Sequence, residues 1–352
     1  MATYNISRLT RGELPEFRDF CEKQWPGRHP LIHNSTMFDY YYRTQDDQFR
    51  FLTARTPDTG ELAGVLGYIQ ANENPHPDIW ASYLLGAGKS AGVALPLLDA
   101  LQTITQAETI ASNNIRKKTA SIYEFMGWTI ADMRQFYRLN SDKNEYTLCI
   151  PGASVIPSVY KDDLVLKQLS CVEQLEDNVF DEKSLRPRKS RFYVINRYFL
   201  NPWIPYRIFA VCEGSLQLAL LVIREFPNGG SLALRVSDYI GPLEIIPRLG
   251  FAMDALLRGS GADFLDWWCY GIETPLLNQA GFVERTPQDG AVVPLYLAPV
   301  SMENITITMY TSHPEGYVMN RADGDQDRPH LEQDGVVTTV PLSAPAHPDS
   351  PQ

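Results

Sequence analysis

Apolar and polar residues alternate in a pattern that predicts a mixed α+β unit in the first half of the chain. A period of two indicates a strand, and a spacing of 3.6 residues indicates a helix. The expected strands cover residues 4–9, 49–54, 61–70, 79–85, 108–112, 129–139 and 145–150. The expected helices cover residues 13–24, 95–101 and 117–126, and Gly127 is a good stop for the last of them.

The second half of the chain repeats this order of elements. Strands are expected at residues 206–212, 216–225, 231–239 and 263–268, with one helix at 247–258 and another that Gly281 ends. Two local matches support a duplication, residues 98–101 with 253–256 and residues 123–128 with 277–282, at nearly the same offset. We therefore expect two domains, residues 1–150 and 151–330, and a disordered tail at 331–352 that is rich in Pro, Ser, Ala and Thr.

Composition and charge narrow the classes of function. The chain has 352 residues, 44% of them hydrophobic, and a formal net charge of −11. This charge argues against binding to nucleic acid or to an anionic membrane, so an anionic ligand must be held by a local site. No apolar run is long enough to cross a bilayer and the N-terminus lacks the features of a signal peptide, which predicts a cytoplasmic protein without membrane insertion. The sequence indicates no oligomeric state.

Neither the cysteines nor the acidic residues predict a metal site. The five cysteines are scattered without a Cys-x-x-Cys pair, and we expect reduced core residues. Residues 323–327 carry alternating carboxylates, but a calcium loop needs glycine where Arg328 stands and glutamate where Asp334 stands. We interpret this stretch, which includes Asp325, as a turn whose carboxylates bond backbone or ligand.

A short turn between a strand and a helix is the strongest candidate for an anion site. We call residues 89–94 the glycine turn; its members are Lys89, Ser90, Ala91, Gly92, Val93 and Ala94. The small residues let the backbone approach a ligand, and the first N–H groups of the next helix have no helical partner, which suits a pyrophosphate. A P-loop is excluded because Tyr83 stands where that motif needs glycine. Pro96 is expected to bend the helix early.

The second copy lacks this turn. The equivalent residues, 243–248, read Leu-Glu-Ile-Ile-Pro-Arg and place bulky side chains where a phosphate needs bare backbone. The second copy also has Leu277 at the position of Tyr123. We expect one active half and one half that supplies a wall or a second substrate's pocket.

The glycine turn resembles the signature Gln/Arg-x-x-Gly-x-Gly/Ala of the GNAT acyltransferases, with Lys89 in the basic place. Together with the helix end at Tyr123 to Trp128, residues 197–202 and the acidic residues 324–329, the chain resembles tandem-GNAT sugar N-acyltransferases. The resemblance implies two tandem GNAT-like α+β domains, each a mixed, mainly antiparallel sheet flanked by helices. It also implies acyl-CoA as co-substrate, the amine of a dTDP- or UDP-linked amino sugar as acceptor, and a role in surface polysaccharide or lipopolysaccharide biosynthesis.

The same resemblance implies roles for single residues. Backbone N–H groups near Leu84 or Leu85 face the thioester carbonyl, and Tyr123 serves as general acid for the leaving thiolate. Where many family members open the tyrosine helix with asparagine this chain has Arg116, so Asn114 nearby is the candidate for contacts to the pantetheine arm. His33, in a polar loop, is the candidate general base; water could also carry the proton.

Candidates for acceptor binding come from the second half and the acidic stretch. Arginines could bind a diphosphate and aromatic side chains could stack on a base or a sugar. The candidates are Arg197, Asp238, Tyr239, Trp268, Tyr270, Asp325 and Arg328. The alternative for each is a structural role, with the tryptophans in the core and the arginines in ordinary surface or structural positions.

Two other functions remain open from the sequence. One is a transferase of the same fold that acts on a peptide, an aminoacyl group or a small-molecule amine. The other is an acyl-CoA-binding protein without catalysis, for which Tyr123→Phe would change nothing measurable.

Overall fold

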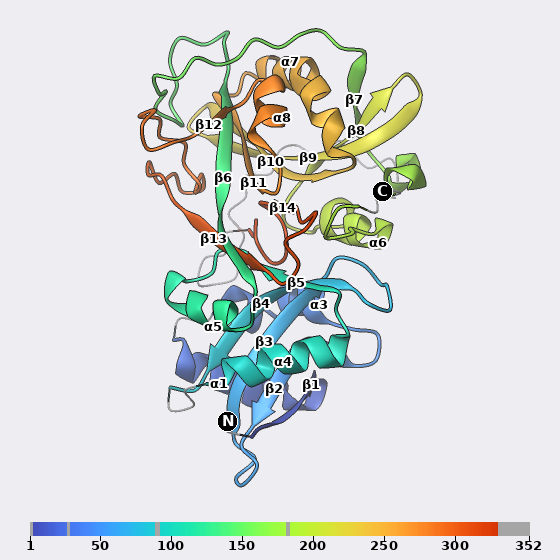
Figure 1. Cartoon of the computed structure of the whole chain (residues 1–352), viewed down its shortest axis with the longest axis vertical. Helices are drawn as coiled ribbons and strands as arrows, with labels where there is room; N and C mark the ends of the chain where they lie inside the picture. The colour runs from blue at the N-terminus through green and yellow to red at the C-terminus, as the bar shows by residue number, and fades with distance from the viewer. Residues whose placement is uncertain (1–2, 27–28, 89–91, 181–183, 330–352) are drawn as a thin grey trace, which may run out of the picture.

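The computed structural model describes residues 3–26, 29–88, 92–180 and 184–329. The described strands form one hydrogen-bonded path, β1-β2-β3-β4-β5-β13-β6-β11-β10-β9-β8-β7, with β12 on β6 and β14 on β11 (Figure 1). The strands are β1 (Asn5–Thr10), β2 (Gln48–Arg55), β3 (Leu62–Gln70), β4 (Asp78–Gly86), β5 (Thr109–Ser112), β6 (Thr129–Leu139), β7 (Leu164–Leu169), β8 (Arg207–Glu213), β9 (Leu216–Asn228), β10 (Ser231–Ile240), β11 (Phe264–Tyr270), β12 (Val283–Glu284), β13 (Ile307–Thr311) and β14 (Met319–Asn320).

Helices lie against both parts of this sheet (Figure 1). They are α1 (Leu14–Gln24), α2 (Pro30–His33), α3 (Ser35–Tyr42), α4 (Ala94–Thr105), α5 (Ala120–Phe125), α6 (Arg191–Val194), α7 (Gly250–Ser260) and α8 (Thr274–Gln279). Short 3-10 turns cover Arg11–Glu13, Lys117–Thr119, Val172–Gln174, Asp177–Phe180 and Leu243–Leu249, and a π-helical turn covers Ile195–Phe199. The tail at residues 331–352 and the disorder expected there lie outside the described residues.

The expected fold class is confirmed. Within the described residues the named strand pairs are antiparallel except for two, β4 with β5 and β10 with β11. Several local predictions were wrong. The strand expected at 145–150 is reduced to a single bridge between Ile150 and Val292. The helix expected at 247–258 is present as α7, and only its first three residues belong to the preceding 3-10 turn. Helices α2 and α3 lie where no element was expected.

Strand β6 joins the two parts of the sheet. Its first residues, 129–133, pair with β13, and its last residues, 134–139, pair with β11. Strand β13 also pairs with β5, so a segment from late in the chain lies inside the sheet of the first half (Figure 1). The division at residue 150 is therefore not a division of the sheet.

The two sequence matches correspond to matching local geometry. Helices α5 and α8 both end at a glycine in the left-handed region, Gly127 with φ +75° and Gly281 with φ +86°. In both, the residue after the glycine donates its N–H to the carbonyl oxygen five residues earlier, Trp128 to Tyr123 and Phe282 to Leu277, each at 3.0 Å. Glycine suits this helix end because it adopts positive φ without strain.

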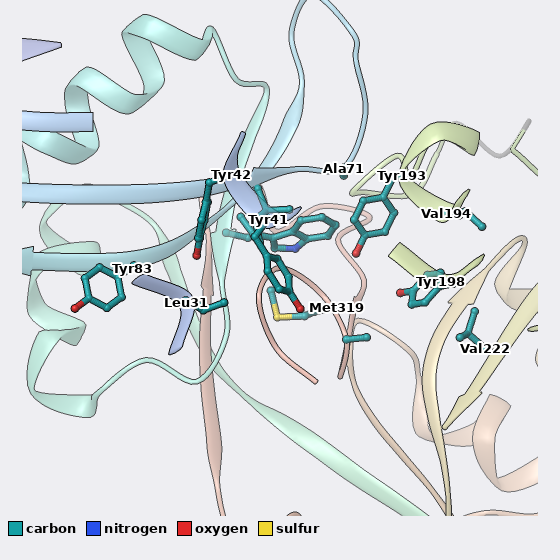
Figure 2. Close-up of a cluster of buried hydrophobic side chains, with 14 of the residues drawn as sticks. Leu31, Tyr41, Tyr42, Ala71, Tyr83, Tyr193, Val194, Tyr198, Val222 and Met319 are labelled. Atoms are coloured by element: carbon teal, nitrogen blue, oxygen red, sulfur yellow. The ribbon is translucent and has the colours of Figure 1, made fainter. Parts of the chain in front are cut away.

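One hydrophobic cluster crosses between the halves. Figure 2 shows Tyr41, Tyr42 and Tyr83 on one side and Tyr193 and Tyr198 on the other, with Met319 between them. All six side chains are buried. Because this cluster draws on both halves, they share one core. Among the described residues no helix is both long and apolar enough to span a membrane.

Candidate functional site

Strands β4 and β5 diverge, and their divergence opens a cavity. They are in parallel register only from Asp78 to Trp80, paired with Thr109 to Ala111, whereas β4 continues to Gly86 with β3 as its partner. We call the resulting hollow, about 460 Å³, the β4 cavity. Its lining includes residues 81–86, so Leu84 and Leu85 lie where their backbone can face a ligand.

Of the described residues of the glycine turn, Ala94 lines this cavity, and Gly92 and Val93 precede it directly. Gly92 has φ +100°, a conformation that residues with a side chain rarely adopt. Val93 is buried, and a Cβ added at Gly86 or at Gly64 would lie only 2.7 or 2.9 Å from its methyl groups. These two glycines therefore leave a notch that Val93 fills, and this contact anchors the start of α4 to the sheet.

Two expectations for this turn change with the structure. The side chain of Val93 packs on the sheet, so its contribution to a ligand site is limited to its backbone; Ala94 lines the cavity. Lys89 and Ala91 lie outside the described residues. The early bend expected at Pro96 loses its basis, because α4 begins at Ala94 and Pro96 falls in its first turn, where backbone N–H groups have no helical partner.

Tyr123, the expected general acid, lines the β4 cavity. Its ring stacks on Tyr310 of β13, with 3.9 Å between ring centroids, and on Trp128 at 6.1 Å. Burial raises the pKa of Tyr123, and a hydrogen bond with Thr119 opposes this shift only in part. The phenol therefore keeps its proton at neutral pH and is able to donate it. Tyr310 also lines the cavity, and sequence reasoning missed it because the sequence signals of β13 were not recognised.

The histidine at the cavity is His29, and sequence reasoning chose His33 instead. The His33 imidazole lies 3.3 Å from the Glu22 carboxylate and lines neither of the cavities described here. His29 lines the β4 cavity and lies edge-on to Tyr83, with ring centroids 5.4 Å apart. The two histidines are four residues apart in one loop and helix, and the pattern of that segment held no signal to separate them.

The environment of His29 keeps its imidazole neutral. Burial, followed by the nearby Arg328 guanidinium, lowers the pKa of His29 to about 4. Arg328 lies 3.2 Å from Nε2, and because a guanidinium can only donate, Nε2 is the acceptor and the proton of the neutral ring is on Nδ1. Nδ1 is buried and has no hydrogen-bond partner among the described residues. His29 is thus a neutral polar group held at the cavity.

Basic side chains give the β4 cavity a positive local character in an acidic protein. Arg116, Lys118 and Arg328 are among its lining residues. The Arg116 guanidinium lies over the Trp25 ring, 5.2 Å from its centroid, and Trp25 stacks on Tyr83 at 5.7 Å. Such a group can bind phosphate oxygens while the ring holds it in place.

A second cavity adjoins the first. We call it the arginine cavity; its volume is about 390 Å³. Both cavities are lined by four of the same residues, His29, Asn114, Gln326 and Arg328. Asn114, expected to contact the donor, thus lies at the junction. The remaining lining includes three arginines of the second half, Arg224, Arg235 and Arg321, which sequence reasoning missed because they lie on separate elements.

Three expected acceptor residues have structural partners instead. Arg197 is buried and donates to the Tyr41 hydroxyl at 2.7 Å and to the Ala322 and Gln326 carbonyl oxygens. Asp238 is fully buried and accepts from Lys189 at 2.5 Å and from Tyr198 at 2.6 Å. Trp268 is fully buried, and its indole N–H donates to Asp266.

The other expected acceptor residues divide into two pairs. Tyr239 is buried and donates its hydroxyl to the Pro242 carbonyl oxygen at 2.6 Å, and Tyr270 packs half-buried against the core shared by the halves. Neither lines the arginine cavity or the β4 cavity. Asp325 lines the β4 cavity, and Arg328 lines both cavities. Most of the seven expected acceptor residues thus have partners inside the protein. Asp325 and Arg328, from the acidic residues 324–329, lie at the cavities.

Solved structures with a similar architecture include a GCN5-related N-acetyltransferase. One, from Anabaena variabilis ATCC 29413, aligns with a TM-score of 0.52 at 12% identity over 88% of this chain and 72% of that chain. Another, a protein of unknown function from Enterococcus faecalis V583 described as a probable N-acyltransferase, aligns with a TM-score of 0.52 at 9% identity over 89% and 73%. No family model and no curated protein sequence matches. The chain therefore shares the GCN5-related N-acetyltransferase fold.

Proposed function

We propose that the protein is an N-acyltransferase that moves an acyl group from acyl-CoA to the amine of a nucleotide-linked amino sugar. The observation that carries this proposal is the β4 cavity. It combines a diverging strand pair, a positive-φ glycine at a helix start and a protonated tyrosine, and the adjoining arginine cavity offers room for an acceptor.

The residues present fit an acyl-CoA. Backbone N–H groups at residues 92–94, at the start of α4, suit its pyrophosphate, and Arg116 and Lys118 supply positive charge nearby. At Leu84 and Leu85, β4 pairs with β3 alone, so one of these two residues directs its backbone N–H away from β3, where it is able to polarise a carbonyl. When bound, the co-substrate supplies an activated thioester.

The chemistry proposed for the chain's residues is a direct transfer. The acceptor nitrogen forms a bond to the carbonyl carbon and the carbon–sulfur bond breaks. Water takes the proton that the amine loses, and Tyr123 donates its proton to the departing sulfur. His29 does not suit this step, because its Nε2 already accepts from Arg328 and its pKa is lowered to about 4, and His33 stays the candidate general base that the sequence predicts.

The acceptor assignment rests on charge and position. Arg328 lies at the junction of the cavities, 3.2 Å from His29, and Asp325 is 3.7 Å from Arg328. A diphosphate at Arg328 would place an attached amino sugar next to His29 and the β4 cavity. A role in surface polysaccharide biosynthesis follows if the acceptor is a dTDP- or UDP-linked sugar.

The test is acetyl-CoA titrated into the full chain, followed by thiol release with a panel of dTDP- and UDP-amino sugars. We expect binding of acetyl-CoA and release of one thiol per sugar acylated, both weakened by Gly92→Ala. Thiol release with peptides or aminoacyl compounds alone would show that the acceptor is not a sugar, while the acyl-transfer chemistry of the proposal would stand. Binding without turnover of any amine would contradict the enzymatic proposal.

A further inference from the structure

Arg321 is a buried arginine without a carboxylate of its own. Its exposed fraction is 8%, and it lines the arginine cavity. Its Nε has no hydrogen-bond partner among the described residues, and a terminal nitrogen lies 3.4 Å from the Gln326 side-chain oxygen. Within the described part of the chain, Arg321 forms no ion pair within 4.0 Å.

The other two second-half arginines of the cavity are paired. Arg235 makes two hydrogen bonds to the Asp266 carboxylate, at 2.7 and 2.8 Å, and two more to backbone carbonyl oxygens. Arg224 donates to Asp327 at 2.5 Å. A buried guanidinium is normally compensated in this way, because the loss of its hydration costs several kcal/mol per ion in proteins by a rough estimate.

The nearby carboxylate of Asp327 is already engaged. One of its oxygens accepts from Arg224, and the other accepts from the hydroxyls of Tyr206 and Ser237, each at 2.9 Å. Burial lowers the pKa of Arg321 to about 10, and the negative charge of Asp327 opposes this shift in part. Arg321 is therefore still a cation at neutral pH. Several of its N–H groups donate to no acceptor among the described residues.

We propose that Arg321 binds an oxyanion of the acceptor, with a phosphate ester as the group that its cavity suits. This inference rests on the proposed function, which supplies the acceptor. Arg321 and Arg328 line the same cavity, so two guanidinium groups can share one multiply charged group, as a diphosphate requires. The exposed Tyr296 side chain in the same lining offers aromatic surface to the group that the phosphate carries.

The geometry orders the acceptor along the two cavities. Arg328 contacts His29 at the junction, whereas Arg321 lines only the arginine cavity. An acceptor held by Arg321 through its phosphate thus has its far end directed to the junction, where the β4 cavity begins. In this arrangement the phosphate of the acceptor determines which molecules bind, and the amine of the acceptor lies next to the acyl donor.

The experiment compares Arg321→Met, which keeps the length of the side chain and removes the charge, with Arg321→Lys and with Arg207→Met. Arg207 is a basic residue of β8 paired with Glu225 and outside both cavities. Calorimetry measures binding of UDP, dTDP, inorganic pyrophosphate and, as a carboxylate probe, malonate to each full-length variant. We expect a loss of about 30- to 100-fold in UDP affinity for Arg321→Met, a smaller loss for Arg321→Lys and no change for Arg207→Met.

Thermal unfolding separates a ligand-binding arginine from a structural one. Removing a buried charge that lacks a partner should leave the melting temperature of Arg321→Met unchanged or raise it. A lower melting temperature with unchanged UDP affinity would overturn the inference. So would malonate binding that needs Arg321 while the phosphates bind without it.

The outcomes also distinguish this inference from the proposed function. Acetyl-CoA binding is measured on the same variants and should not change with Arg321→Met. If acetyl-CoA does not bind to any variant, the proposed function fails, while an Arg321-dependent phosphate affinity still stands. If acetyl-CoA binds and amines are acylated, but Arg321→Met binds phosphorylated acceptors as tightly as the wild type, the inference about Arg321 fails and the proposed function stands.

Discussion

The ends of the two parallel strand pairs differ in what surrounds them. In the first half, β4 leaves β5 after Trp80 and opens on the β4 cavity beside Gly92. In the second half, β10 is in register with β11 only to Val236, and the next residues include Asp238, buried against Lys189. The same arrangement of strands is thus open at one end and closed by a charged network at the other.

The local sequence explains much of this difference. The segment after β4 leads through Gly92 into α4, whereas the segment after β10 forms the 3-10 turn Leu243–Leu249, which buries Ile246 and Leu249. Strand β14 adds a pairing to the end of β11 that β5 does not have. The two halves thus share this pair of parallel strands, and the segment that follows the strands differs between them.

The largest expected effect concerns the closed end. Lys189 lies between Asp238 and Asp323, at 2.5 and 2.6 Å, and all three are buried. Lys189→Met leaves two buried carboxylates without a counterion and should lower the free energy of unfolding by about 3 to 5 kcal/mol. Urea unfolding measures this, with Lys167→Met on the surface as control. A loss below about 1 kcal/mol would show that the network does not hold this end closed.

The next effect concerns the open end. Tyr123→Phe keeps the stacking on Tyr310 and removes the hydroxyl, and we expect kcat to fall about 100-fold because a general acid contributes factors of this order. Tyr310→Phe, a matched change in the same stack, should alter kcat by less than about threefold. Steady-state kinetics with acetyl-CoA compares the two. Equal losses would assign the effect to packing.

His29 predicts a dependence of stability on pH. The unfolded histidine binds a proton near pH 6.5 and the folded one only near pH 4, so between these values the unfolded state holds more protons. The contribution of His29 to stability should be constant above pH 6.5 and fall by about 3 kcal/mol as the pH drops to 4. His29→Asn should lose this slope and His33→Asn should keep it. Urea midpoints at several pH values measure it, and an unchanged slope in His29→Asn would contradict the assignment.

The smallest effect distinguishes two positive-φ glycines. Gly92→Ala meets no atom within 4 Å, so its cost is the strained φ of +100°. We expect about tenfold weaker binding of acetyl-CoA, which corresponds to about 1.4 kcal/mol. Gly261→Ala, at φ +67° after α7, should destabilise the fold by a similar amount without changing acetyl-CoA affinity. If both variants bind equally well, the glycine turn is not part of the donor site.

How far the sequence predicted the site depends on the range of the interactions involved. The sequence pointed to the glycine turn and Tyr123 as candidates because each belongs to a short local signal, a strand followed by small residues and a helix that ends at glycine. His29 was missed in favour of His33, because which histidine faces the cavity depends on how the loop before α2 packs on Tyr83. Arg197 and Trp268 were expected at a ligand and have polar partners inside the protein, although Arg197 also lines a separate cavity. Residue type alone does not reveal a buried partner.

The sequence by itself determined the order of most strands and helices, the repeated helix ends at Gly127 and Gly281, and the presence of the glycine turn in only one copy. These follow from the periodicity of apolar residues and from backbone conformations that glycine adopts without strain. The tertiary structure decided that β13 lies between β5 and β6, that Arg328 contacts His29, and that Arg321 is buried without a counterion. Those features depend on pairing between segments far apart in the chain, which no local pattern encodes.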